Sequence, residues 1–242
     1  MDIKIFDHPT WKPLDYFGIS NNFFYLNYHT LISTWLVLFL LFIFGLIVKN
    51  SITKKNRIYY FAYKYVALFE DTVTQALGAY KPMHIVFIAS LFTFLLLANC
   101  LSILPFTEEP TTDINTTLAL GVTAFIYIQI MAIKKHGIKE FIKGYLEPFF
   151  LFFPLNIIGS LATIISLSFR LFGNILGGSV ISGLWKYFIG GSVITELIGV
   201  FTGANILITS YFGIFDGVLQ AFVFSLLSLT YLSMEIQESE SC

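Results

Sequence analysis

The chain has 242 residues, of which 56% are hydrophobic, 18% aromatic and only 12% charged, and its formal net charge is −1. So few charged side chains cannot cover the surface of a soluble globule, and a nucleic-acid binder is excluded because binding phosphates needs a strong basic excess. The two cysteines, Cys100 and Cys242, show no CxxC or Cys/His spacing, so no metal site is expected. The composition therefore indicates a membrane protein.

The first 30 residues form a polar N-terminal arm. Its start is acidic and lacks a basic region followed by a short apolar core, so it does not have the pattern of a cleavable signal. We expect this arm to stay on the mature chain.

Five apolar stretches follow the arm, each near or above the roughly 20 residues that cross a bilayer core as a helix. They are Leu31–Val48, Pro82–Leu104, Thr116–Ile133, Leu151–Trp185 and Ser192–Met234. Because a backbone in lipid must satisfy its own hydrogen bonds, all five are predicted to be helices. The predicted fold class is an all-α membrane protein with five transmembrane helices.

Basic residues gather in the connections after the first and the third stretch. They are Lys49, Lys54, Lys55, Arg57, Lys64 and Lys81 in one connection, and Lys134, Lys135, Lys139 and Lys143 in the other. The positive-inside rule places both connections in the cytoplasm, and it places the arm and the acidic loop 105–115 on the opposite side. The predicted orientation is N-terminus out and C-terminus in, and Glu108, Glu109 and Asp113 need only solvate the outer loop.

Segments 56–81 and 137–150 mix charged with aromatic residues. This mixture predicts amphipathic helices that lie on the inner membrane surface, with ordinary solvated loops as the alternative.

The last two stretches are longer than an upright span requires. At helical rise, residues 151–185 would extend about 52 Å and residues 192–234 about 64 Å, against a core of about 30 Å. Neither contains a polar turn that would split it. We therefore expect residues 151–242 to form a hairpin of two long, steeply tilted helices, with a break at Gly199 or Gly203 as the alternative. Residues 31–150 would hold the first three spans and the interfacial helices.

Each long helix carries one stripe of polar and small residues when residues are placed 100° apart. The first stripe contains Asn156, Gly159, Thr163, Ser166, Arg170, Gly173, Asn174 and Gly177. The second contains Thr202, Asn205, Thr209, Gly213, Asp216, Gly217 and Gln220, with Tyr231 further along. Close packing between membrane helices would explain the glycines, but it would not explain Arg170 or Asp216.

Arg170 keeps its charge at any accessible pH and costs at least about 2.5 kcal/mol at the centre of a bilayer. No acid lies within a turn of it, and the nearest in sequence, Glu147, would be about 34 Å away along a helix. Asp216 on the second long helix could pair with it. We favour the other interpretation, in which the counter-ion is a carboxylate of another chain.

Three motifs resemble those of one family. "SLSFRLFGNILGG", residues 166–178, resembles the signature of subunit a of the F-type ATP synthases, in which the arginine of "RLFGN" faces the rotating c-ring. "LQAFVFSLLSLTYLS", residues 219–233, resembles the C-terminal signature of that family, with its glutamine at Gln220. "DINTTLALGV", residues 113–122, is similar to the start of the family's middle helix, and "NCLSILPF" resembles the segment before it.

The resemblance implies an ion-translocating stator subunit that is not itself an enzyme and needs no cofactor. Its partners would be the c-ring (subunit c), the subunit b peripheral stalk and the other synthase subunits, within the lipid bilayer of a bacterial inner membrane or an organelle. Arg170 would lower the pKa of each passing ring carboxylate and would separate two half-channels. Asn174 and Gln220 match positions around this arginine, and Asn115 matches a polar position near the outer entrance.

Two positions depart from the family pattern. The first position lies nine residues past the arginine, where the family has Glu or His and this chain has Ser179. The second lies seven residues before the glutamine, where this chain has Gly213. Asp216, one turn from Gln220, is the candidate relay acid, and Glu196 is the weaker candidate because it lies about 120° from the stripe. The sequence leaves open whether the ion is H⁺ or Na⁺, and whether the complex synthesises or hydrolyses ATP.

Two other classes fit less well. A secondary transporter would show an internal repeat or matching broken segments, and the chain has neither. An intramembrane enzyme would need a nucleophile and a base, but all four histidines fall at or beyond the ends of the spans.

Overall fold

The structure is a computed structural model that describes residues 10–11, 26–101, 110–146, 151, 153–190, 203 and 211–237. These parts of the chain are almost entirely helical. One pair of two-residue strands, β1 (Thr10–Trp11) and β2 (Leu26–Asn27), pairs antiparallel before the first helix. Five of the helices are long and apolar enough to cross a membrane, so the predicted five-span helical fold is confirmed.

The five long helices correspond one to one to the five apolar stretches. They are α1 (Tyr28–Lys54), α3 (Pro82–Cys100), α4 (Ile114–His136), α6 (Phe153–Ile189) and α9 (Asp216–Gln237). The shorter elements are α2 (Arg57–Leu77), α5 (Ile138–Leu146), the 3₁₀ turn η4 (Pro110–Thr112) and the π-helical turn η6 (Tyr211–Phe215).

Local chemistry sets several of these helix ends. Pro82 lies in the first turn of α3, where its missing N–H would have had no helical partner. The Asp113 side chain caps α4 by accepting a hydrogen bond from the Asn115 backbone N–H at 3.0 Å. Gly78 follows α2 with a φ of 66°, a left-handed conformation that glycine adopts without a steric penalty.

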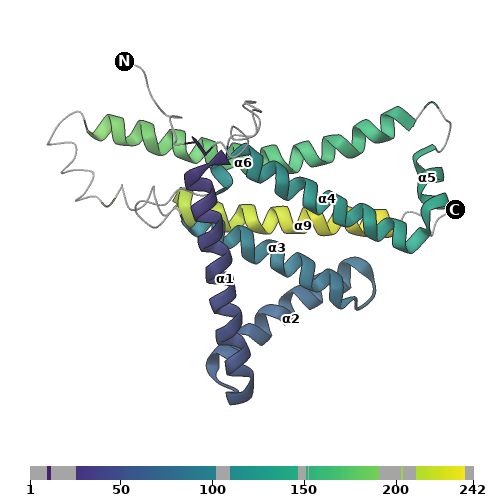
Figure 1. The fold of residues 1–242 in the computed structure, drawn as a ribbon, viewed down its shortest axis with the longest axis horizontal. Coiled ribbons are helices and arrows are strands. Elements are labelled where there is room, and N and C mark those ends of the chain that lie inside the picture. Colours follow the sequence, from purple (N-terminus) through teal and green to yellow (C-terminus); the bar gives the residue numbers. More distant parts are fainter. Residues whose placement is uncertain are drawn as a thin grey trace.

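The core of the molecule lies between α3, α4 and α9. One buried cluster joins Ile85 and Ile88 of α3 to Ile128 of α4 and Leu232 of α9, and α2 adds Phe69, Val73 and Leu77 to it. α1 is peripheral: Val37 is its one residue in a buried apolar cluster of the described chain, together with Ala98 and Leu101. Figure 1 shows α1 crossing the directions of α9 and α6 at a wide angle.

Within the two segments predicted to be amphipathic, Arg57–Leu77 and Ile138–Leu146 are helical, so the alternative of irregular loops is wrong for these residues, while residues 147–150 lie outside the described chain. α2 packs one apolar face against the bundle, and its Tyr65 hydroxyl shares a 2.7 Å hydrogen bond with Thr93 of α3. No residue of α5 is buried. The position of both helices on a membrane surface remains a prediction.

The first long helix is present as predicted. α6 is unbroken over 37 residues, which corresponds to about 55 Å at helical rise. Its tilt in the membrane remains a prediction.

The second long helix differs from the prediction. Gly203 has a φ of 67°, which a right-handed helix does not contain, so an unbroken helix over Ser192–Met234 is wrong. The alternative of a break at Gly203 is the one that the structure supports. The π-helical turn η6 precedes α9, while residues 191–202, including Gly199, and 204–210 lie outside the described residues.

Candidate functional site

Arg170 lies near the middle of α6, beside the helix face that packs into the core. Leu167 and Leu171, which flank it, are 3% and 0% exposed and belong to a buried cluster with Ala221 and Phe224 of α9. Arg170 itself is exposed. It forms no ion pair and no hydrogen bond within the described part of the chain. α6 therefore buries the neighbours of the cation and leaves the cation on an outer surface.

The polar stripe around Arg170 is open along most of its length. A Cβ atom added at Gly159, Gly173 or Gly177 would meet no heavy atom of the described chain within 4 Å. Ser166, one turn before Arg170, is exposed as well. Packing within the described residues therefore does not explain these three glycines, and those residues leave most of the stripe uncovered.

On another face, α6 approaches α4 very closely. A Cβ atom added at Gly121 of α4 would collide with the Ser168 hydroxyl and lie 3.3 Å from the Ile164 carbonyl oxygen. Ser168 is fully buried, and its hydroxyl has no hydrogen-bond partner within the described residues. This small-residue contact, two residues before Arg170, fixes which face of α6 points outward.

The stripe of α9 faces inward, unlike that of α6. A Cβ atom at Gly217 would lie 2.8 Å from the Asn99 Cβ atom. The Asn99 side-chain amide donates a 3.0 Å hydrogen bond to the Gly217 carbonyl, and Thr111 Oγ1 donates to Asn99 Oδ1, also at 3.0 Å. Three elements, α3, η4 and α9, thus meet in one buried polar network beside Asp216.

Gln220, one turn after Asp216, also points into the protein. It is 6% exposed, and its Nε2 atom has no hydrogen-bond partner in the described ranges. Its neighbour Ala221 packs in the same cluster as Leu167 and Leu171, so α6 and α9 touch at the level of Arg170 and Gln220.

The structure brings only some of the predicted site residues together. Asn174 is partly buried on α6, Asp216 is partly buried at the first position of α9, and Asn115 is exposed in the first turn of α4. Within the described residues, no hydrogen bond or ion pair joins any two of Arg170, Asn174, Asp216 and Gln220. Ser179 lies on α6 and Gly213 lies in η6.

Glu196 lies outside the described residues, as do Glu108 and Glu109.

Sequence reasoning missed Asn99 and Thr111. The available signal was Asn99 itself, an amide inside an otherwise apolar span, in the motif "NCLSILPF". A buried polar side chain needs a hydrogen-bond partner, and that requirement marks Asn99 as a contact residue.

No group of three or more His, Cys, Asp or Glu residues that could hold a metal occurs in the part of the chain that the structure describes.

Fold and site together define a class of protein: a helical multi-span membrane protein whose longest helix carries an exposed cation on a stripe of small and polar residues. Residues 31–233 match the family model described as ATP synthase A chain. The chain therefore belongs to the family of subunit a of the F-type ATP synthases, an ion-translocating subunit of the membrane sector that associates with other synthase subunits.

Three bacterial relatives illustrate the similarity. The chain is 33% identical over 231 residues to "ATP synthase subunit a, sodium ion specific" of Propionigenium modestum. The aligned region covers 87% of this chain and 75% of that protein. It is 30% identical over 208 residues to "ATP synthase subunit a" of Moorella thermoacetica, covering 85% and 89% of the two chains. It is 29% identical over 208 residues to "ATP synthase subunit a 2" of a Picosynechococcus strain, covering 84% of each chain. With five apolar helices, these relatives support a multi-pass protein of a bacterial inner membrane.

Proposed function

We propose that this chain provides two half-channels for ions and that Arg170 gates the protonation of c-ring carboxylates between them. Coupling of ion flow to rotation of the ring follows from this gate. The observation that carries the proposal is the position of Arg170, exposed on an open stripe of α6 and without a counter-ion in the described chain.

The gate works through the charge of the guanidinium. A cation within about 4 to 6 Å lowers the pKa of a carboxylate by about 1 to 3 units, so a protonated ring acid releases its proton on reaching Arg170. The same fixed charge repels a free proton and prevents direct passage between the half-channels. Each charge that moves through 100 mV supplies about 2.3 kcal/mol to turn the ring.

The open stripe suits a helix of the ring as the missing neighbour. Gly173 and Gly177 have no side chain and nothing of the described chain above them, so the backbone of a second helix can approach α6 closely there. An approaching carboxylate would then reach Arg170 in a low-dielectric setting, where a charge pair is strong. In this proposal each ring carboxylate in turn offsets the free-energy cost of holding the Arg170 charge within the membrane.

We assign the relay role to Asp216, with Glu196 as the weaker candidate. Asp216 is partly buried and follows directly on η6, beside the network of Thr111, Asn99 and Gly217. We place Asn115 near the outer entrance, and Asn174 and Gln220 around the gate. Ser179 occupies a family relay position without an ionisable group, which is why the acid must come from elsewhere on the chain.

The remaining assignments complete the proposal. The N-terminus lies outside and the C-terminus inside, and residues 151–242 face the c-ring. Residues 1–30 form the outer arm, residues 31–150 hold the first three spans, subunit b is a second partner, and nucleotide chemistry belongs to other subunits. The ion is H⁺ or Na⁺, and ATP synthesis driven by a pH gradient or by a sodium gradient distinguishes them.

The decisive experiment replaces Arg170 with alanine in the assembled complex. We expect proton-driven or sodium-driven ATP synthesis in membrane vesicles to fall to background, because the ring carboxylates would no longer be discharged. Ser166→Ala, on the same exposed face, is the matched control and should retain synthesis. Retained synthesis by Arg170→Ala would refute the gate.

A second measurement separates the gate from a structural ion pair between Arg170 and Asp216. If the two side chains pair, Arg170→Ala and Asp216→Ala each destabilise the chain and the double variant is less destabilised than their sum. The proposal predicts additive effects on thermal unfolding of the isolated chain.

A further inference from the structure

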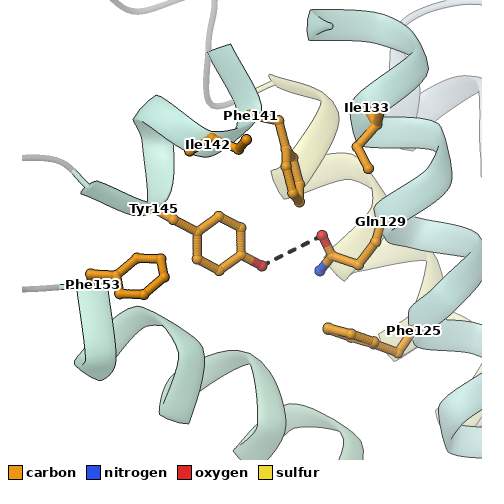
Figure 2. Close-up of a pocket in the computed structure, with 7 residues that line it drawn as sticks. All are labelled: Phe125, Gln129, Ile133, Phe141, Ile142, Tyr145 and Phe153. Atoms are coloured by element: carbon orange, nitrogen blue, oxygen red, sulfur yellow. Dashed lines mark hydrogen bonds between the residues drawn. The ribbon is translucent and has the colours of Figure 1, made fainter. Parts of the chain in front are cut away.

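A cavity of about 340 Å³ lies between α4, α5 and the start of α6. Figure 1 shows α4 and the first part of α6 diverging toward α5. The cavity is lined by Phe125, Gln129, Ile133, Phe141, Ile142, Tyr145 and Phe153 (Figure 2). Phe153 is about 25 Å from Arg170 at helical rise, so this site is separate from the proposed gate.

The lining is apolar except for one polar corner. Tyr145 donates a long hydrogen bond of 3.5 Å to Gln129 Oε1 (Figure 2). The same hydroxyl shares a 3.1 Å hydrogen bond with Ser160. The amide nitrogen of Gln129 makes no hydrogen bond within the described residues. The corner therefore offers the two N–H donors of one amide group to an occupant that is otherwise hydrocarbon.

A hydrogen bond also joins α5 to α6, two of the helices that line the cavity. Asn156 of α6 donates a 2.9 Å hydrogen bond to the Tyr145 carbonyl, which ties the end of α5 to α6. Because α5 buries none of its residues in the bundle, it covers the gap between α4 and α6 without filling it. Ile142 remains 50% exposed at the rim.

Positive charge surrounds this end of the bundle. Lys134, at the end of α4, and Lys139 and Lys143, one turn apart on α5, are all exposed, and Glu140 is the one acid of α5. Exposed lysines beside an interfacial helix attract anionic lipid headgroups, each by about 1 kcal/mol. The apolar slot thus lies on the same two helices, α4 and α5, as these exposed lysines.

A volume of about 340 Å³ with an almost entirely apolar lining suits a single acyl chain, which is much thinner than a helix. The volume also falls within the range of about 300 to 1,000 Å³ that is usual for ligand pockets.

We propose that this cavity binds one acyl chain of an anionic phospholipid. The headgroup phosphate lies at the level of Lys139 and Lys143, and the ester carbonyl accepts a hydrogen bond from the Gln129 amide. The bound lipid fills the wedge between α4 and α6 and holds α5 in place.

The test uses the full-length chain, exchanged into nanodiscs that contain equal amounts of phosphatidylglycerol and phosphatidylcholine. Native mass spectrometry then counts the lipids that remain bound after release. We expect one phosphatidylglycerol to be retained in preference to phosphatidylcholine. Lys139→Gln with Lys143→Gln should lower that preference about ten- to thirty-fold. Lys55→Gln with Lys64→Gln, which removes two exposed lysines elsewhere, is the matched control and should leave the preference unchanged.

A second set of variants tests the slot independently of charge. Ile142→Trp and the smaller change Ile142→Phe fill the cavity and should release both lipids, while Ile138→Trp on the exposed surface of α5 should not. Thermal unfolding checks that each variant is folded.

Equal retention of the two lipids, or an unchanged lipid count in folded Ile142 variants, would overturn the proposal. Ion flow is not measured in any of these assays, so their outcome is independent of the Arg170 gate.

Discussion

Gly121 of α4 lies so close to Ser168 of α6 that a Cβ atom at position 121 would collide with the serine hydroxyl. The same approach brings position 121 to the Ile164 backbone carbonyl, which cannot move aside as a side chain can. The orientation of α6, and with it the outward position of Arg170, depends on this contact.

Gly121→Val is therefore expected to destabilise the chain by about 1 to 3 kcal/mol, because overpacking forces α4 and α6 apart. Thermal unfolding of the purified chain measures this change. Gly144→Val on α5 is the matched control, since a Cβ atom there meets nothing within 4 Å. Equal unfolding temperatures for the two variants would contradict the close crossing.

Gly173 and Gly177 should respond differently in the isolated chain and in the complex. Alanine at either position fits without contact and improves helix propensity by about 1 kcal/mol, so the isolated chain should be at least as stable as the parent. Leucine should leave the isolated chain folded and yet block ring association, because its bulk occupies the open stripe. The two readouts are thermal unfolding of the chain and copurification of the c-ring, and a leucine variant that retained the ring would refute the assigned surface.

Asn99 should be a stability determinant although it is a polar residue within a membrane span. Asn99→Leu leaves the Gly217 carbonyl and the Thr111 hydroxyl without their partner, at a cost of about 1 to 3 kcal/mol. Thr111→Val removes only the hydrogen bond to Asn99 Oδ1 and should therefore destabilise the chain less than Asn99→Leu does. In a double-mutant cycle by thermal unfolding, the two changes should not be additive, and strict additivity would show that the network has no energetic coupling.

Asp216→Asn should reduce ion flow through the assembled membrane sector, because the amide cannot take up and release a proton. Asp216→Glu should retain part of the flow, and Asp71→Asn, an exposed acid on α2, is the control. Passive flow into vesicles stripped of the catalytic sector is the measurement. Unchanged flow in Asp216→Asn would transfer the relay role to Glu196, which Glu196→Gln tests directly.

The sequence predicted the spans because apolar length is a local property that the bilayer imposes. It also placed Arg170 on one stripe with Gly173 and Gly177, and the described structure shows that stripe to be open. The break at Gly203 was harder to foresee, since Gly173 and Gly177 lie inside an unbroken α6. A glycine permits a left-handed φ without requiring it, so the presence of a glycine does not by itself predict where a helix breaks.

The different orientation of the two stripes was not predictable either. Both stripes have the same mixture of small and polar residues, yet Gly217 packs against Asn99, 118 residues earlier in the chain. The spacing of residues within one helix cannot predict a contact with a residue so distant in the sequence. Glu196 lies outside the described residues, so its role stays a prediction.

The unbroken course of α6 through Arg170 also has a mechanical consequence. A sideways load on the guanidinium is passed into a continuous ladder of backbone hydrogen bonds and, through Leu167 and Leu171, into the bundle. A loop at this position would yield to the same load. Under the proposed function, in which a ring turns past Arg170, the unbroken helix would resist this load and distribute the force on one side chain over the whole bundle.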